Sequence, residues 1–199
     1  MQKLQPVRGT HDLLPETARR HLHVIARGRE LAERFGYQPI DTPMFEFTEV
    51  FKRTLGDTSD VVTKEMYSFA DKGGDEVTLR PEGTAGVVRA VLSGGLLQDL
   101  PLKFFYAGPM FRHERPQAGR LRQFHQFGVE YFGTPDAKAD VDVIALLWRF
   151  LSDLALPDLT LEINSLGSSA DRATYLPVLV SFLKSRQDKL CDNCRRRIE

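Results

Sequence analysis

The segment between residues 103 and 132 constrains the fold of this chain more than any other. Residues 103–107, 110–114 and 123–132 are rich in Phe, Tyr and Val, which favour β-strands. The last two segments flank a short basic loop, so they are predicted to pair as one long antiparallel hairpin. Any fold for this chain therefore has to be built around that hairpin.

Helices are predicted on both sides of the hairpin in the sequence. Pro15 can open a helix and Gly36 can close it, and apolar residues recur between them at steps of three and four. Further helices are predicted over 46–55, 83–92 and 140–154, and the composition is helical again after Gly167. Extended segments are predicted at 37–40 and 159–163, and a second hairpin at 66–69 and 77–80.

The predicted fold class is α+β, with a mostly antiparallel sheet flanked by helices, because the strands cluster as hairpins rather than alternating with helices. The 199 residues suffice for one sizeable domain, or for one domain and a fragment. No stretch approaches 18 uninterrupted apolar residues and the N-terminal residues do not form a signal peptide, so the cytoplasm is the expected compartment.

Charge and cysteine content limit the possible partners. Lys plus Arg and Asp plus Glu are both 27, so a nucleic acid would have to be bound by a local basic patch. The only cysteines are Cys191 and Cys194, and a zinc site would need two more ligands. We therefore expect reduced thiols and no structural metal, although a metal or redox role stays open.

Several common catalytic motifs are absent. The sequence contains no Gly-Lys dipeptide and hence no phosphate-binding G-x-x-x-x-G-K-[ST] loop, and no G-x-G-x-x-G follows a strand. It also lacks a G-x-S-x-G nucleophile motif. A nucleotide, if bound, must be held in another way.

The strand over 123–132 carries the first candidate site. Side chains alternate along a strand, so Gln126, Gly128 and Glu130 share one face. Gln126 and Glu130 are about 13 Å apart, and Gly128 between them leaves space for a small zwitterion with two polar ends. A solvent-exposed face with a bulge at Gly128 explains the same pattern equally well on its own.

The neighbouring strand and loop carry cationic candidates. Arg112 and Glu114 share a face, and an arginine on a rigid sheet can bind a phosphate and stabilise charge that develops at phosphorus. A surface ion pair is the simpler interpretation of these two residues. The loop at 115–122 contains three arginines and Gln117, which suit phosphates and base edges, although many basic loops are merely solvated.

The segment from Arg80 to Thr84 carries candidate acceptors. Pro81 interrupts the strand, and Glu82 and Thr84 follow it at the start of a predicted helix. Their carboxylate and hydroxyl could accept hydrogen bonds from an ammonium group. Glu82 is equally well placed to stabilise the positive end of the helix dipole.

Taken together, these segments resemble the class II aminoacyl-tRNA synthetases, and the histidyl-tRNA synthetases most closely among them. The resemblance runs through the following motifs in order: Val7-Arg8-Gly9-Thr10-His11-Asp12, Gly36-Tyr37 to Pro43, Thr78-Leu79-Arg80-Pro81-Glu82-Gly83-Thr84, Phe111-Arg112-His113-Glu114-Arg115-Pro116 and Arg122 to Glu130. Helix 15–35 with the strand ending at Pro43 resembles the family's first motif, which forms the dimer interface. The hairpin around the basic loop resembles its second motif.

The resemblance implies a role for each candidate residue. It implies that Arg112 is the catalytic residue, which binds the α-phosphate of ATP, and that Glu114 binds the adenine end. It implies a histidine-binding set of Glu82, Gly83, Thr84, Arg112, Gln126 and Glu130, with Glu130 on the imidazole. Arg115 and Gln117 would contact the acceptor end of tRNA(His).

The implied reaction has two steps, in which histidine attacks Mg²⁺-bound ATP and the histidyl group then passes to tRNA. By resemblance, 1–166 is the catalytic core, and 167–199 begins a helical insertion. Family members continue with a further arginine segment, a third motif and an anticodon-binding domain. If the 199 residues were the whole molecule, we would expect histidine-pocket groups but little aminoacylation.

Two other functions fit parts of the pattern. The regulatory subunit of ATP phosphoribosyltransferase shares the fold and senses histidine, but it tends to lose the Arg-His-Glu-Arg-Pro and Glu-Gly-Thr runs that this sequence keeps. A dimerising or interaction piece without catalysis is the third possibility. The motifs favour the ligase.

Overall fold

The computed structural model describes residues 4–56, 59, 61–115, 117, 119–165, 167–196 and 198. By internal contacts the chain divides into two compact units, Met1–Pro157 and Asp158–Glu199. The first unit contains both sheets and all candidate site residues.

The central sheet of the first unit has the strand order β1-β5-β6. β5 (Leu102–Phe111) and β6 (Gln123–Phe132) pair antiparallel over their full lengths, which confirms the predicted hairpin. β1 (Gln38–Pro39) adds a short parallel edge against β5. The α+β prediction with a mostly antiparallel sheet is therefore confirmed.

The prediction of two separate strands at 103–107 and 110–114 is wrong, because β5 runs without a break through Pro109 and ends at Phe111. The Pro109 carbonyl accepts a hydrogen bond from Arg80 Nε at 2.9 Å, so this residue turns its backbone polar atoms away from β6. The missing N–H of Pro109 therefore costs the β5–β6 ladder no hydrogen bond.

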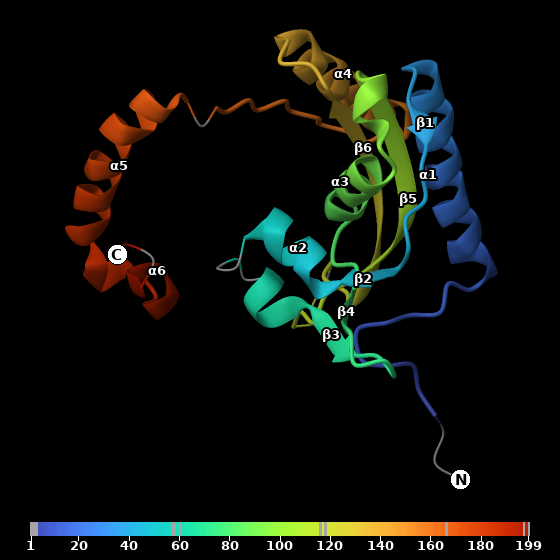
Figure 1. The fold of residues 1–199 in the computed structure, drawn as a ribbon, viewed down its shortest axis with the longest axis horizontal. Helices are drawn as coiled ribbons and strands as arrows, with labels where there is room; N and C mark the ends of the chain where they lie inside the picture. Colours follow the sequence, from blue (N-terminus) through green and yellow to red (C-terminus); the bar gives the residue numbers. More distant parts are fainter. Residues whose placement is uncertain are drawn as a thin grey trace. The chain divides into compact units, whose positions relative to one another are not determined.

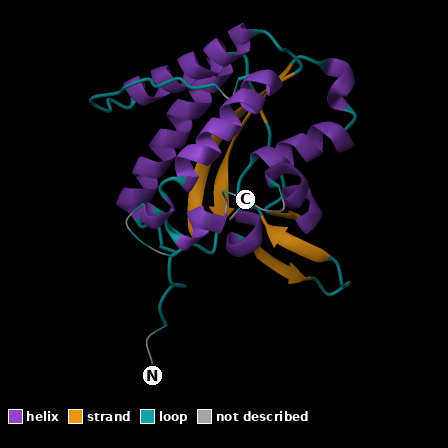
Figure 2. Cartoon of the chain, turned by 90° about the vertical axis from the view of Figure 1, so that its left-hand side faces the viewer, coloured by secondary structure: helices purple, strands orange, loops and turns teal. Residues whose placement is uncertain are grey.

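A second, smaller sheet has the order β2-β4-β3 and is antiparallel throughout. β3 (Tyr67–Ala70) and β4 (Glu76–Leu79) form the predicted second hairpin. β2 (Phe45–Phe47) was not predicted: its residues pair with β4, so α2 (Thr48–Leu55) begins two residues later than the expected 46–55 helix. Figure 2 shows this small sheet beside one end of the long hairpin.

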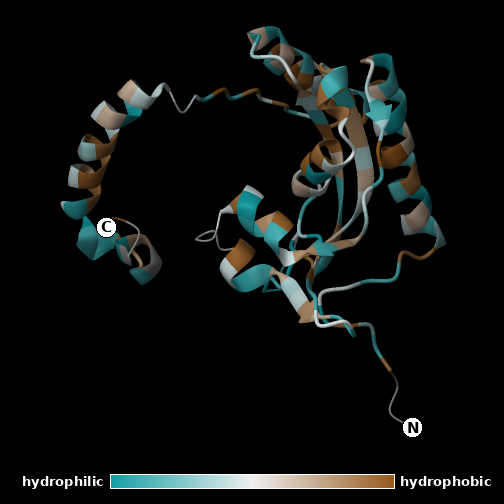
Figure 3. Cartoon of the chain, viewed as in Figure 1, coloured by the Kyte–Doolittle hydropathy of each residue, from teal (hydrophilic) through white to brown (hydrophobic). Residues whose placement is uncertain are grey.

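Helices cover both faces of the long hairpin (Figure 1). On one face, α1 (Pro15–Arg34) and α4 (Ala137–Asp153) pack on Phe105 and Phe127. On the other, Val87 of α3 (Thr84–Ser93) packs against Tyr106 and Met110. α1 carries both hydrophobic and hydrophilic residues in Figure 3, as expected for a helix with one face on the core.

The remaining elements of the first unit are short turns of helix. η1 (Val61–Glu65) follows α2, and η2 (Leu96–Asp99) follows α3. None of the helices that the structure describes is both long and apolar enough to cross a lipid bilayer.

The second unit contains α5 (Ser169–Lys184), η3 (Gln187–Lys189) and α6 (Asp192–Arg196). Ser168 and Asp171 form a capping box at the start of α5. The predicted strand at 159–163 is wrong, because these residues belong to none of the strands in the part of the chain that the structure describes. Apolar alternation indicates a surface suited to a sheet, but a strand also needs a hydrogen-bonded neighbour.

The packing of α1 on β6 yields the first testable prediction. A Cβ added to Gly28 would lie 2.7 Å from Cε2 of the Phe127 ring, which is held in the core. Glycine to alanine normally stabilises a helix interior, but overpacking a core costs about 1–3 kcal/mol. Gly28→Ala should therefore lower the melting temperature. Thr17→Ala at an exposed position of the same helix should leave it unchanged or raise it, and a Gly28→Ala variant as stable as Thr17→Ala would contradict this packing.

Candidate active site

The start of α3 docks on one face of β6 through two hydrogen bonds. The Gly83 backbone N–H donates to Gln126 Oε1 at 3.1 Å, and the Thr84 hydroxyl donates to Glu130 Oε1 at 2.7 Å. Gln126 and Glu130 therefore face the same side of the sheet, as the strand alternation predicts. The structure thus brings together four of the residues expected to bind histidine.

Glu82 joins this group from the turn before α3. Its side chain is buried, and its two carboxylate oxygens accept hydrogen bonds from the backbone N–H groups of Thr84 at 2.6 Å and Ala85 at 2.8 Å. The interpretation of Glu82 as a group that stabilises the helix N-terminus is therefore confirmed. This contact fixes the carboxylate next to Thr84 and Glu130.

Tyr106 fills the space that we expected to be open above Gly128. These two residues face each other in the β5–β6 register. A Cβ on Gly128 would lie 2.4 Å from the Tyr106 hydroxyl, and one on Gly83 would lie 2.2 Å from the same ring. The ring therefore fits between two glycines, and a Cβ at either position would clash with it. The sequence analysis missed Tyr106, although pairing the two strands in register would have placed it opposite Gly128.

Burial changes the acidity of two groups in this cluster. Desolvation raises the pKa of Tyr106 to about 12, so the phenol stays protonated at neutral pH. Desolvation also raises the pKa of Glu130 above its ordinary value, with a smaller contribution from the nearby Glu82 carboxylate. Hydrogen bonds from Thr84 and Tyr106 partly oppose this rise in the pKa of Glu130.

Arg112 lies just beyond the end of β5, on the same face as Met110. Its Nε donates to the Pro81 carbonyl at 2.9 Å, and its guanidinium carbon is 5.2 Å from the centre of the Phe124 ring. The side chain is 28 % exposed, so the arginine is held at the surface of the site rather than turned into the core. Its Nη1 is 4.0 Å from Glu114 Oε1, which places the cation and the carboxylate side by side.

The basic loop follows directly. Glu114 also pairs with Arg120, with Nη1 and Oε2 3.1 Å apart. Arg115 and Gln117, expected to bind tRNA, are exposed, and the backbones of Gln117 and Arg120 hydrogen-bond to each other. The expected loop also contained Pro116 and Ala118, which lie outside the described residues.

Arg80 is a buried cation that the sequence analysis did not assign. It is 5 % exposed, and its guanidinium donates to the carbonyls of Pro109 at 2.9 Å and Thr42 at 2.7 Å. A Cβ on Gly108 would lie 2.3 Å from its Nη2. Arg80 therefore fastens the turn before α3 to β5. Its position directly before Pro81, within the run from Thr78 to Thr84, was the sequence feature that could have indicated a structural role for this arginine.

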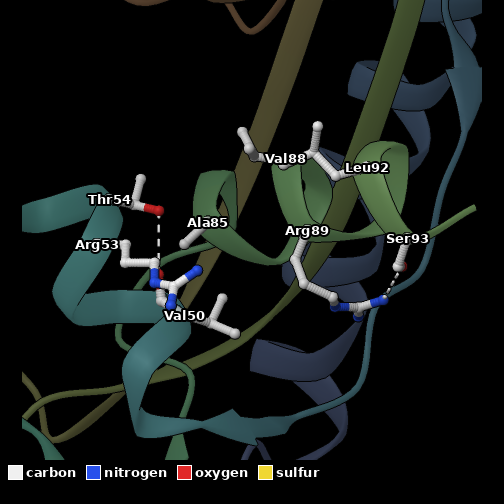
Figure 4. A pocket seen from close by; sticks show the side chains of 8 residues that line it. All are labelled: Val50, Arg53, Thr54, Ala85, Val88, Arg89, Leu92 and Ser93. Atoms are coloured by element: carbon white, nitrogen blue, oxygen red, sulfur yellow. Dashed lines mark hydrogen bonds between the residues drawn. The ribbon is translucent and has the colours of Figure 1, made fainter. Parts of the chain in front are cut away.

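A separate cavity of about 580 Å³ lies between α2 and α3 (Figure 4). It is lined by Val50, Arg53, Thr54, Ala85, Val88, Arg89, Leu92 and Ser93. None of the expected site residues lines this cavity.

No group of three or more His, Cys, Asp and Glu side chains is placed to hold a metal ion within the described part of the chain. Cys191 and Cys194 are exposed in the second unit.

Comparison with known proteins identifies the family. A family model described as histidyl-tRNA synthetase matches residues 9–169. The chain belongs to the histidyl-tRNA synthetase family. A histidine–tRNA ligase from Rhodospirillum rubrum is 59 % identical over the whole chain, which spans 48 % of that relative. A relative of the same name from Gluconacetobacter diazotrophicus is 53 % identical over the same span.

Solved structures agree with the histidyl-tRNA synthetase assignment. The apo histidyl-tRNA synthetase of S. aureus matches with a TM-score of 0.76 and 36 % identity, over all of this chain and 46 % of its own. An ATP phosphoribosyltransferase regulatory subunit/histidyl-tRNA synthetase from Bacillus halodurans matches 79 % of this chain and 40 % of its own, with a TM-score of 0.68 and 29 % identity. The chain thus spans about half the length of the relatives that it matches.

The raised pKa of Glu130 yields a prediction on stability. The folded state holds the proton of this carboxyl more tightly than the unfolded state, whose pKa is near 4.5. Glu130 therefore lowers stability progressively as the pH rises from about 4.5 to its higher folded pKa, and by a constant amount above it. Glu130→Gln keeps an acceptor for Thr84 and removes the buried charge.

We therefore expect Glu130→Gln to raise the free energy of unfolding at pH 7, with a gain that vanishes below about pH 4.5. Urea unfolding at several pH values measures the free energy of unfolding and its pH dependence, and Glu162→Gln, at an exposed position, serves as the control. A gain that is constant with pH, or a loss at pH 7, would contradict the burial of an ionised Glu130.

Proposed function

We propose that this chain supplies the part of a histidine–tRNA ligase that binds histidine and the α-phosphate of ATP. The observation that carries the proposal is the convergence of Thr84, Gln126 and Glu130 on one sheet face, with Arg112 beside them. Family membership supports the same reaction.

Histidine would bind through its two polar ends. The ammonium group needs acceptors, and Glu82, Thr84 and Gln126 offer them at the start of α3 and on β6. Glu130 would accept a hydrogen bond from the imidazole. In the structure these acceptors are engaged with neighbours, so histidine would exchange protein hydrogen bonds for its own. Gly83 would serve by giving space to Tyr106.

ATP would bind around Arg112 and Glu114. Arg112 is held by the Pro81 carbonyl and can direct its remaining N–H groups to the α-phosphate. Glu114 would accept a hydrogen bond from the amino group at the adenine end. Mg²⁺ would enter with the triphosphate as part of the substrate, where it offsets phosphate charge.

The reaction needs no side-chain nucleophile. A carboxylate oxygen of histidine forms a bond to the α-phosphorus, and the bond from that phosphorus to the pyrophosphate oxygen breaks. A ribose hydroxyl of the tRNA end then attacks the histidyl carbonyl, loses its proton and displaces AMP. Arg112 would act as the catalytic residue by opposing charge that builds at the α-phosphate. Positioning of the two substrates provides most of the remaining rate enhancement.

The basic loop would receive the acceptor end of tRNA(His). Arg115 and Gln117 are exposed on it and suit phosphates and base edges. In this proposal residues 1–166 form the catalytic core and 167–199 begin a helical insertion. The compartment would be the cytoplasm, where tRNA is charged.

The second candidate function is histidine sensing. The Bacillus halodurans structure carries the name of an ATP phosphoribosyltransferase regulatory subunit as well as that of a synthetase. The groups expected to bind histidine serve either function. The pairing of Arg112 with Glu114 favours the ligase, because histidine sensing alone requires no nucleotide site.

The proposal predicts separable losses of two ligands. Glu130→Ala should weaken histidine binding by about tenfold or more and leave ATP binding within about twofold, because Glu130 would contact the imidazole alone. Arg112→Ala should weaken binding of Mg²⁺-ATP by about tenfold or more. Isothermal titration calorimetry on the 199-residue chain measures both affinities, with Lys138→Ala on α4 as the control. Equal losses of the two ligands in Glu130→Ala would argue against the assigned roles.

We further propose that the chain forms a homodimer through α1 and the segment to Pro43. Leu14 and Leu22 are 68 % and 64 % exposed at the start of this region. Phe45 and Phe47 follow it, with 57 % and 59 % of their surface exposed. Exposed apolar groups of this size are typical of protein interfaces.

The dimer proposal is tested by sedimentation velocity. The wild-type chain should sediment as a species of about twice the 22.6 kDa mass of one chain. Leu22→Asp should raise the dissociation constant of the dimer by about tenfold or more. Lys138→Asp, at a 90 % exposed position of α4, should not change it. A wild-type chain that stays monomeric at 100 μM or about that concentration would contradict the proposal.

A further inference from the structure

The N-terminal residues form a turn that the mechanism above does not use. The backbone N–H and the hydroxyl of Thr10 both donate to the Val7 carbonyl, at 2.9 and 2.7 Å. Gly9, the third residue of this turn, has a φ of +87°. A type II turn requires a positive φ at this position, which favours glycine. Residues 7–10 are called the N-terminal turn below.

The N-terminal turn is hydrogen-bonded to the long hairpin through Gly9. The Gly9 carbonyl accepts hydrogen bonds from the backbone N–H groups of Arg122 at 2.7 Å and Gln123 at 3.4 Å. A Cβ on Gly9 would lie 2.8 Å from Arg122 Cγ. Gly9 is therefore required twice, by the turn itself and by its close approach to Arg122.

Arg122 is the last residue of the basic loop and directly precedes β6. Its carbonyl accepts from the Arg112 N–H at 3.0 Å, and its Nε donates to the Glu114 carbonyl at 3.4 Å. A continuous path of hydrogen bonds therefore leads from Gly9 through Arg122 to the backbone of Arg112 and Glu114. The first of these links lies at the base of the loop expected to meet tRNA.

The N-terminal turn contributes little to the apolar core. Val7 is 67 % exposed, and residues 4–8 are all exposed. Burial of apolar surface therefore does not explain why the turn lies against the hairpin. The backbone hydrogen bonds to Arg122 and Gln123 are its main attachment.

We infer that the N-terminal turn positions Arg112 and the basic loop for ATP and tRNA, with Gly9 as the positioning residue. This inference rests on the proposed function, because it assigns the turn to the nucleotide side of the same site. The turn reaches Arg112 through Arg122, whereas the hydrogen bonds described for Glu130 and Gln126 lead to the start of α3. Disturbing it should therefore weaken ATP binding much more than histidine binding, for which Glu130 and Gln126 stay in place.

The experiment compares Gly9→Asn with Gly36→Asn in the 199-residue chain. Asn tolerates a positive φ better than other residues with a Cβ, so Gly9→Asn mainly tests the contact with Arg122. Gly36 has a φ of +81° with nothing within 4 Å of an added Cβ, so it controls for backbone conformation alone. Backbone amide exchange at Arg112, Arg122 and Gln123 is measured first, and the affinities for Mg²⁺-ATP and histidine second.

The inference predicts exchange at least about tenfold faster at Arg122 and Gln123 in Gly9→Asn, with a smaller increase at Arg112. It also predicts ATP binding weakened by about fivefold or more and histidine binding within about twofold. Gly36→Asn should change none of these. Thr10→Val removes one hydrogen bond of the turn, so it should speed amide exchange and weaken ATP binding by about twofold to threefold. This variant replaces Gly9→Asn in the test if Gly9→Asn does not fold.

Three results would overturn the inference. The first is an unchanged rate of amide exchange in Gly9→Asn, and the second is faster amide exchange with unchanged affinity for ATP. The third is an equal loss of affinity for ATP and for histidine. If the wild-type chain bound no ATP, the proposed function would fail and the role of the turn toward ATP with it. The exchange measurement would then still show whether the turn orders the loop.

Discussion

The candidate site depends on how one tyrosine ring fits between two glycines. Tyr106 projects from β5 into space left by Gly128 on β6 and by Gly83 before α3. A Cβ at either glycine would fall within 2.4 Å of the ring, so the start of α3 can approach the sheet only with this combination of residues. That approach allows Thr84 to reach Glu130, and Gln126 to reach the backbone of Gly83.

The cationic side of the site is held by hydrogen bonds to the backbone and by the contact of Arg112 with the Phe124 ring. Arg112 lies one residue beyond the end of β5. Its place is set by its bond to the Pro81 carbonyl and by the pairing of its N–H with Arg122. The buried Arg80 ties the turn that contains Pro81 to β5.

The sequence predicted the elements whose signals are local and missed features that depend on neighbours. The face shared by Gln126 and Glu130 followed from strand alternation alone, and the hairpin from two long β-favouring segments. The alternation of side chains along one strand does not tell which residues of the two strands lie opposite each other. The Tyr106 ring over Gly128 was therefore not predicted, and the glycine was interpreted as open space. The same limit explains the unpredicted β2 strand and the strand expected at 159–163, since both outcomes depend on the presence of a partner. The roles of individual residues came from family resemblance and not from periodicity.

The most direct test of the account is a titration of the chain with histidine, followed residue by residue through its backbone amide NMR signals. If histidine binds where α3 meets β6, the largest shifts should fall on 82–85 and 126–130, and those of 169–184 in α5 should stay in place. Gly83 should respond strongly, because its N–H now donates to the amide of Gln126, which the ligand would engage. Saturable shifts confined to other regions, with 82–85 unaffected, would contradict the central claim.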